Sequence, residues 1–113
     1  MWNYNNSTKR LTFPRGDTPR IKFTITGIPE GTTPTLTFTM RAKPEKTSPI
    51  ICTKQLQKVG DFYFLQFEEN DTEGQAYGVY DYDIEYRVEG TPVIVQTIIY
   101  GHIELTKEVT IHE

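Results

Sequence analysis

Residues 77–89 read YGVYDYDIEYRVE, and this stretch decides the fold class. Large apolar side chains alternate with charged ones along it, which is the pattern of a β-strand with one face in a core and the other in water. The inward face is predicted to consist of Tyr80, Tyr82, Ile84, Tyr86 and Val88. The outward face is predicted to consist of Asp81, Asp83, Glu85, Arg87 and Glu89. The stretch therefore predicts a half-buried strand in an all-β domain.

The same alternation recurs along the rest of the chain, between turns that contain glycine and proline. Strands are predicted at residues 9–13, 20–26, 35–41, 50–56, 61–67, 79–88 and 93–105. About seven strands at this spacing favour an antiparallel β-sandwich of the immunoglobulin type, with a small barrel as the alternative. Gly101 interrupts the last strand and indicates a bulge or a close approach of another backbone.

Residues 68–76 are the one stretch predicted to be helical. Asn70 is the predicted cap, because Glu73 follows it by three residues as in a capping box. Gly74 is expected to end the helix after a single turn.

Length and charge limit the class of protein. The chain has 113 residues, of which 36% are hydrophobic and 24% are charged, and this composition fits one globular domain. We expect the domain at residues 9–113, after a flexible arm at residues 1–8. A formal net charge of −3 argues against binding to nucleic acid or to an anionic membrane. The apolar runs are too short to span a bilayer.

Cys52 is the only cysteine in the sequence. An intrachain disulfide is therefore impossible, and the sandwich must be held together by packing. The residues after Met1 are polar, so no secretory signal is predicted. These features predict folding in a reducing cytoplasm.

Three acidic residues on one strand face, Asp81, Asp83 and Glu85, are the first candidates for chemistry. Same-face neighbours on a strand lie about 7 Å apart, a separation that suits an inverting glycosidase pair or a weak calcium site. A solvated sheet face with basic cross-strand partners explains these acids better. We therefore interpret the row as a polar surface.

Other catalytic patterns are weak. His102 and His112 lack the close, fixed spacing of a zinc site. No nucleophile stands in a recognisable pattern with a histidine, and no glycine-rich phosphate loop is present in the sequence. The sequence therefore predicts no enzyme, no bound metal and no cofactor.

The segment GVYDY at residues 78–82 resembles the tyrosine corner of immunoglobulin-like domains. In such a corner, the hydroxyl of a tyrosine bonds to the backbone just upstream. The resemblance implies a structural role for Tyr80 and for Gly78. Tyr82 stands where antibody domains have a cysteine, so the likeness is to the architecture of the sandwich.

Three motifs taken together resemble a known family. They are RGDT at residues 15–18, GVYDYDI at 78–84 and YGHIELTKEVT at 100–110. The combination is similar to small immunoglobulin-like proteins of tailed phages and Gram-positive prophages, above all to the N-terminal domain of upper-baseplate proteins. The resemblance implies a non-catalytic sandwich, made in a bacterial cytoplasm, that docks onto other tail or baseplate proteins of the virion.

Exposed apolar side chains would form the working surface of such a module. The strands at 61–67 and 93–105 carry apolar residues on both faces, and the arm carries two aromatic residues. The predicted interaction residues are Trp2, Tyr4, Phe62, Phe64, Ile94, Ile98 and Tyr100. They are expected to contact other virion proteins or a second copy of the chain.

The alternative function is a carbohydrate-binding β-sandwich that recognises surface glycans. This function requires aromatic side chains in a solvent-exposed groove, with polar groups beside them. Tyr63, Tyr86 and Tyr100 would qualify only if they face solvent, and the period of two places Tyr86 inside.

Overall fold

The structure is a computed structural model that describes residues 2–25, 33–43 and 48–107. Within these ranges it contains nine strands and one short helix. The elements are β1 (Asn3–Asn5), β2 (Arg10–Pro14), β3 (Arg20–Phe23), β4 (Thr35–Arg41), β5 (Ile50–Gln55), β6 (Gln57–Val59), β7 (Phe62–Gln66), α1 (Glu69–Thr72), β8 (Gly78–Val88) and β9 (Ile94–Thr106). His112 and the end of the motif at residues 100–110 lie outside the described residues.

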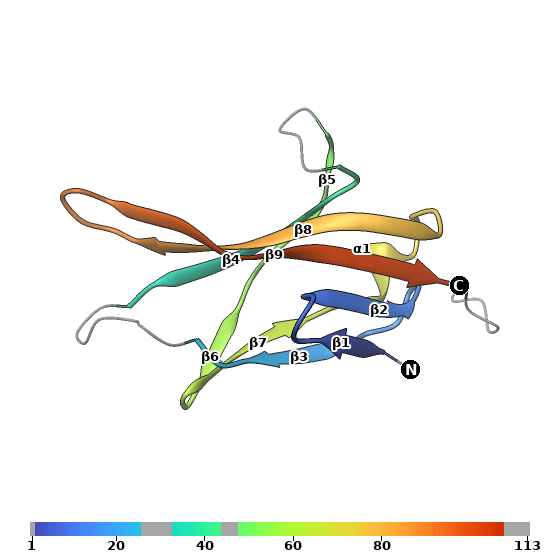
Figure 1. Cartoon of the computed structure of the whole chain (residues 1–113), viewed down its shortest axis with the longest axis horizontal. Helices are drawn as coiled ribbons and strands as arrows, with labels where there is room; N and C mark the ends of the chain where they lie inside the picture. The colour runs from blue at the N-terminus through green and yellow to red at the C-terminus, as the bar shows by residue number, and fades with distance from the viewer. Residues whose placement is uncertain (1, 26–32, 44–47, 108–113) are drawn as a thin grey trace.

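The strands form two sheets that pack face to face as a sandwich (Figure 1). The larger sheet has the strand order β1-β2-β9-β8-β4-β5, and the smaller sheet has the order β3-β7-β6. The prediction of an all-β sandwich is therefore confirmed. The immunoglobulin type of its strand arrangement stays a prediction.

One strand pair departs from the predicted antiparallel arrangement. β2 and β9 run parallel, with Leu11 opposite Ile103 and Phe13 opposite Leu105. Parallel neighbours need a long connection between them, whereas antiparallel neighbours can be joined by a tight hairpin. Most of the chain connects β2 to β9, so no hairpin turn imposes an antiparallel register on this pair.

The predicted strand at residues 50–56 is divided between the two sheets. β5 pairs with β4 in the larger sheet, and β6 pairs with β7 in the smaller one. Leu56 lies between β5 and β6, is buried, and donates its N–H to the carbonyl oxygen of Leu36 at 2.9 Å. The chain therefore crosses from one layer of the sandwich to the other at Leu56.

The core between the sheets is rich in aromatic rings. Phe67, just after β7, packs against two rings of the larger sheet, with centroids 5.0 Å from Phe13 and 5.4 Å from Phe38. All three side chains are fully buried, and burial of each contributes about 1.5–3 kcal/mol. The residues that the alternation of β8 places inward are buried as well, except that Val88 near the hairpin tip is half-buried.

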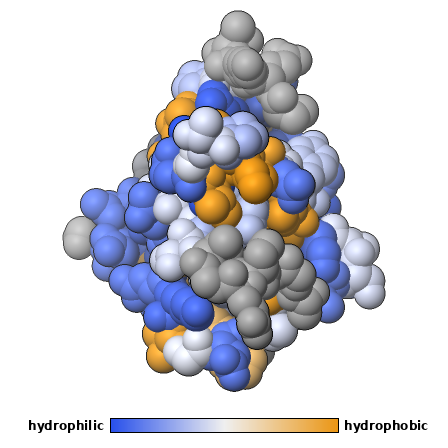
Figure 2. Space-filling view, turned by 90° about the vertical axis from the view of Figure 1, so that its left-hand side faces the viewer, coloured by the Kyte–Doolittle hydropathy of each residue, from blue (hydrophilic) through white to orange (hydrophobic). Residues whose placement is uncertain are grey.

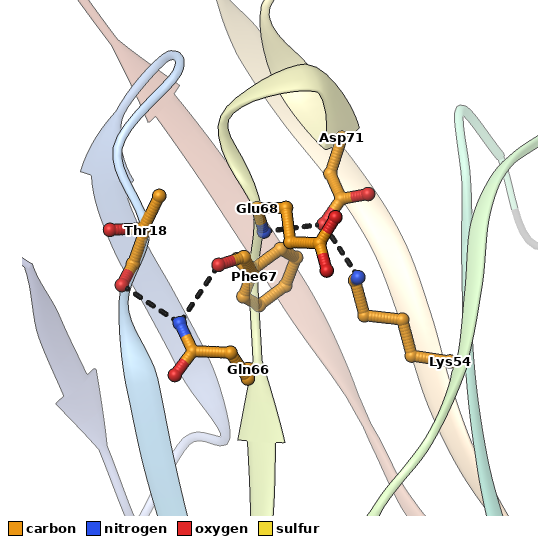
Figure 3. A network of polar contacts seen from close by, with 6 residues as sticks. All are labelled: Thr18, Lys54, Gln66, Phe67, Glu68 and Asp71. Carbon is orange, nitrogen blue, oxygen red and sulfur yellow. Dashed lines mark hydrogen bonds and ion pairs between the residues drawn. The ribbon is translucent and has the colours of Figure 1, made fainter.

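The helix α1 is a single turn, and its cap differs from the predicted one. The N-cap is Glu68, and Asn70 lies inside the helix. The carboxylate of Asp71 accepts a hydrogen bond from the N–H of Glu68 at 2.7 Å and lies 2.8 Å from Nζ of Lys54 (Figure 3). The turn begins after Glu68 because Asp71, three residues further on, binds the backbone there. Within the described ranges, no helix is long and apolar enough to cross a membrane.

A short strand lies within the arm that the sequence predicts to be flexible. β1 pairs with β2, with Tyr4 opposite Leu11. The ring of Tyr4 meets the ring of Phe23 edge-on, with centroids 5.4 Å apart. Burial of one aromatic ring therefore ties residues 3–5 to the sandwich. Three residues are too few for their alternation to reveal such a strand.

Gly101 is the site of a close backbone approach, as its position in the last strand suggested. A Cβ atom at Gly101 would lie 2.3 Å from the carbonyl oxygen of Lys9. The same oxygen accepts a hydrogen bond from the hydroxyl of Tyr82. The turn that precedes β2 therefore crosses β9 at a residue without a side chain.

β8 and β9 form a long antiparallel hairpin, whose tip extends past the smaller sheet (Figure 1). β2 pairs with β9 only over Ile103–Thr106, near the end of β9. A bulge interrupts the hairpin, because Ile84 lies opposite Ile99 whereas Glu85 lies opposite Thr97. Ile98 is therefore the extra residue of the bulge.

Candidate interaction surface

Tyr80 and Gly78 hold the start of β8 in place. The hydroxyl of Tyr80 donates to the carbonyl oxygen of Ala76 at 2.6 Å. This is the upstream backbone contact that the resemblance to a tyrosine corner implies. Gly78 has a φ angle of 141°, a conformation that residues with a side chain rarely adopt. Both residues therefore serve the fold at this corner.

The acidic residues of β8 lie on the outer face of the larger sheet, among residues of neighbouring strands. Asp81 accepts a hydrogen bond from the hydroxyl of Tyr100 at 2.8 Å. Its Oδ1 atom also lies 3.2 Å from Nε2 of His102. Both contacts join Asp81 to cross-strand neighbours on β9, but these are a tyrosine and a histidine and not the lysine or arginine partners that were expected.

Asp83 is the member of the acidic row whose ionisation is perturbed. Burial is the main cause that raises the pKa of Asp83, and the negative charge of Glu85 raises it further. The positive charge of Arg41 partly offsets both effects. Among the described residues, no three His, Cys, Asp or Glu side chains are placed to hold a metal ion together.

The outer face of the smaller sheet carries two phenylalanines that are covered by basic side chains. The guanidinium of Arg20 lies 4.0 Å from the ring centroid of Phe64, and Nζ of Lys22 lies 4.3 Å from that of Phe62. Tyr63, between the two rings in sequence, faces the core. Each of these cation–π contacts covers one face of a ring. The apolar surface predicted at Phe62 and Phe64 is therefore partly covered by the chain itself.

A polar groove of about 390 Å³ opens beside this face. Nε2 of Gln66 donates to the carbonyl oxygens of Thr18 and Phe67, at 3.2 and 2.9 Å (Figure 3). Lys54 pairs with Asp71. The groove is lined by Arg20, Lys54, Gln55, Gln57, Phe64, Gln66 and Glu68. Two of its polar side chains are therefore committed to contacts within the chain.

A run of exposed residues that includes two apolar neighbours lies on β9 in the projecting hairpin. Residues 94–97 are all exposed, whichever face of the strand they occupy. Ile94 and Val95 are 47% and 46% exposed, and Tyr100 is 50% exposed. Ile98 is half-buried and packs against the core, so only part of this predicted interaction residue is accessible. Figure 2 views the molecule from the hairpin end and shows hydrophobic residues, in orange, on that face.

The two aromatic residues of the arm have different surroundings. Trp2 is 41% exposed and remains available for contacts. Tyr4, predicted for the same surface, instead packs against the core. Its hydroxyl is buried without a hydrogen-bond partner among the described residues, although it lies close enough to the hydroxyl of Tyr82 to affect that group's pKa. Burial raises the pKa of both tyrosines. Tyr4 therefore anchors β1.

Sequence reasoning missed Val93 and Val95 as surface residues. They are 42% and 46% exposed, and they belong to the same apolar run, VIVQTII at residues 93–99, as the predicted Ile94 and Ile98. A run without alternation does not reveal which of its members are exposed. The signal that could have found them is the lack of any charge from Val93 to Tyr100.

A comparison of the chain with models of protein families finds no match, and a comparison with curated proteins finds none either. The likeness to phage baseplate proteins therefore rests on the three sequence motifs. The first of them, RGDT, forms a turn after β2: Gly16 has a φ angle of 85°, and the N–H of Asp17 donates to the carbonyl oxygen of Pro14 at 3.1 Å.

Proposed function

We propose that the chain is a non-enzymatic structural module that binds other protein subunits through the projecting β8–β9 hairpin. The observation that carries the proposal is the exposed apolar run of β9, where Ile94 and Val95 are nearly half-exposed on opposite faces of the strand. Covering such side chains contributes about 25 cal/mol per Å² of apolar surface removed from water. Contiguous exposed apolar residues of this kind are typical of protein interaction sites.

The assembly that we propose for this module is the tail or baseplate of a phage or prophage. The three motifs that resemble baseplate proteins support this assignment. A sandwich held by packing alone also suits a virion part that is assembled inside a bacterium. Burial raises the pKa of Cys52 to about 12, so its thiol is suited to packing and not to redox chemistry.

The test is to purify tail particles after prophage induction in the source strain and to quantify the chain by mass spectrometry. We expect the chain to sediment with the particles in a fixed ratio to a tail-tube protein. A chain carrying Val95→Lys should be lost from the particles, whereas a chain with Val59→Lys, the same substitution at an exposed valine on β6, should be retained. A wild-type chain that remains in the unassembled fraction would contradict the assignment to a virion.

Carbohydrate binding is the second candidate function, and the polar groove beside Phe64 is the observation that favours it. Tyr63 and Tyr86 are buried, so two of the three tyrosines considered for this role are unavailable. A glycan array decides between the candidates. Binding of a defined glycan that is lost in Gln57→Ala would support this function, and an array without hits would exclude it.

A further inference from the structure

We infer that the edge of β9 pairs with the edge of β9 in a second copy of the chain, across a two-fold axis at Gln96. The inference rests on the proposed role of the hairpin as an interaction surface, and it is independent of the phage assignment. A second copy of the chain is the partner that the edge of the hairpin fits best.

The edge of β9 is unpaired over its first half. β8 lies along one side of β9, but on the other side β2 begins to pair only at Ile103. No other described strand lies along Ile94–Tyr100. An unpaired edge presents free N–H and C=O groups that can accept a further strand.

This edge lacks the features by which proteins usually prevent pairing. Residues 94–100 read IVQTIIY, without a charge or a proline. The other outer strands carry such features: Arg20 and Lys22 on β3, Lys54 on β5, and Lys58 on the three-residue β6. β1 is also only three residues long. Charged side chains and short length both discourage edge pairing, so β9 offers the most accessible edge of the described sheets.

The edge is complementary to itself in an antiparallel pair. With Gln96 on the two-fold axis, Val95 lies opposite Thr97 of the second copy, and Ile94 lies opposite Ile98. All of these side chains are uncharged, and a two-fold axis requires the same patch on both copies. Two copies that each carry a net charge of −3 can approach at this uncharged stretch without placing like charges opposite each other.

The bulge in β9 limits the length of the pairing. Ile98 has no opposite residue in β8, and further along the strand the turn at Lys9 crosses Gly101. Regular pairing with a second copy therefore spans Ile94–Ile98. Residues 94–97 are all exposed, so the second strand needs no rearrangement of the first copy to reach them.

A lysine on the edge tests the inference in solution. Sedimentation velocity of the wild-type chain over a concentration series should show a monomer–dimer equilibrium. Val95→Lys should raise the dimer dissociation constant at least about tenfold, because charge on an edge strand opposes pairing. Val59→Lys makes the same substitution at an exposed valine of β6 and should leave the equilibrium unchanged. A wild-type chain that is monomeric throughout, or a dimer equally affected by both variants, would overturn the inference.

A single cysteine at the axis tests the register. Directly opposite residues of antiparallel strands have Cα atoms about 4.5–5.5 Å apart, which is within the range of a disulfide. Gln96→Cys should therefore form a crosslinked dimer under mild oxidation, whereas Gln57→Cys on β6 should not. Equal rates for the two variants would contradict pairing at Gln96. That result would reject self-pairing through β9. The proposed incorporation into tail particles would still be tested separately, by mass spectrometry.

Discussion

At Gly101 the backbone of β9 lies against the turn that precedes β2. The carbonyl oxygen of Lys9 occupies the space that a Cβ atom would need, and the hydroxyl of Tyr82 donates to the same oxygen. Lys9 itself has a φ angle of 61°, which is uncommon for a residue with a side chain. These three residues come from distant parts of the chain and together fix where β2 enters the larger sheet.

Gly101→Ala should destabilise the protein by about 1–3 kcal/mol, because the added methyl group would overlap the Lys9 carbonyl and push the turn away. Gly74→Ala is the matched control, since a Cβ atom there meets nothing within 4 Å. Urea unfolding of both variants measures the difference. Equal stability of the two variants would show that the turn does not press on β9.

Asp83 should make the stability of the protein depend on pH. Because the pKa of Asp83 is raised in the folded state, its ionisation favours unfolding. This effect is fully present above the raised pKa and disappears below about 3.9, the ordinary pKa of aspartate. Asp83→Asn should therefore increase the free energy of unfolding at pH 7, and this gain should shrink as the pH falls through the raised pKa and be nearly absent below about 4.

The control for this pH dependence is Asp61→Asn, the same substitution at an exposed turn residue before β7. It should leave the free energy of unfolding nearly unchanged at both pH values. Urea titrations at pH 7 and pH 3.5 give the comparison. An Asp83→Asn variant that is less stable than the wild type at pH 7 would contradict the argument.

Among the elements, α1 is too short to be stable by itself and depends on contacts with its surroundings. Asp71 binds the backbone of Glu68 and pairs with Lys54 of β5, and the side chains of this pair are only 14% and 17% exposed. Thr72, fully buried, accepts a hydrogen bond from the N–H of Gly16 at 2.9 Å. The helix therefore links β5 to the turn after β2.

Asp71→Ala should destabilise the protein by about 1–3 kcal/mol, because it removes the hydrogen bond to the N-cap Glu68 and leaves the largely buried Lys54 without its carboxylate. Glu69→Ala, in the same turn but exposed, should cost no more than about 0.5 kcal/mol. Thermal unfolding followed by circular dichroism distinguishes the two. A similar loss in both variants would mean that Asp71 has no special role.

The sequence predicts elements well where alternation is long and fails where other effects decide. The pattern of β8 locates its buried face, from Tyr80 to Tyr86, because a period of two over many residues has no competing interpretation. The strand β1 is too short to show such a pattern, and its pairing depends on Tyr4 reaching Phe23. The parallel pairing of β2 with β9 joins distant segments, and no local signal specifies it.

The sequence predicts only part of the candidate surface, again because no local signal specifies how distant segments pack. An apolar run such as 93–99 indicates a strand that is either buried on both sides or covered by a partner. The run does not show which of these two arrangements applies. Only the arrangement of the sheets shows that the smaller sheet stops short of the hairpin tip (Figure 1). The sequence predicts that the rings of Phe62 and Phe64 lie at the surface. It does not predict the cations that cover them, because Lys22 and Arg20 come from another strand.

At the scale of the whole molecule, the two layers differ in length, and the longer layer ends in an exposed hairpin. The sandwich body buries the aromatic core, while Ile94 and Val95 remain in solvent at the projecting tip. This division fits a scaffold that folds by itself and presents one uncharged strand edge to a neighbour. The edge of β9 is therefore the surface through which we expect the molecule to assemble.

Hydrogen–deuterium exchange of the wild-type chain at low and high protein concentration tests this claim most directly. We predict that peptides covering Ile94–Ile98 exchange more slowly at high concentration, because their backbone groups then pair with a second copy. Peptides covering β6, an outer strand of the smaller sheet, should exchange at the same rate in both samples. Exchange of Ile94–Ile98 that is independent of concentration, or slowing that is equal in β6, would contradict the account.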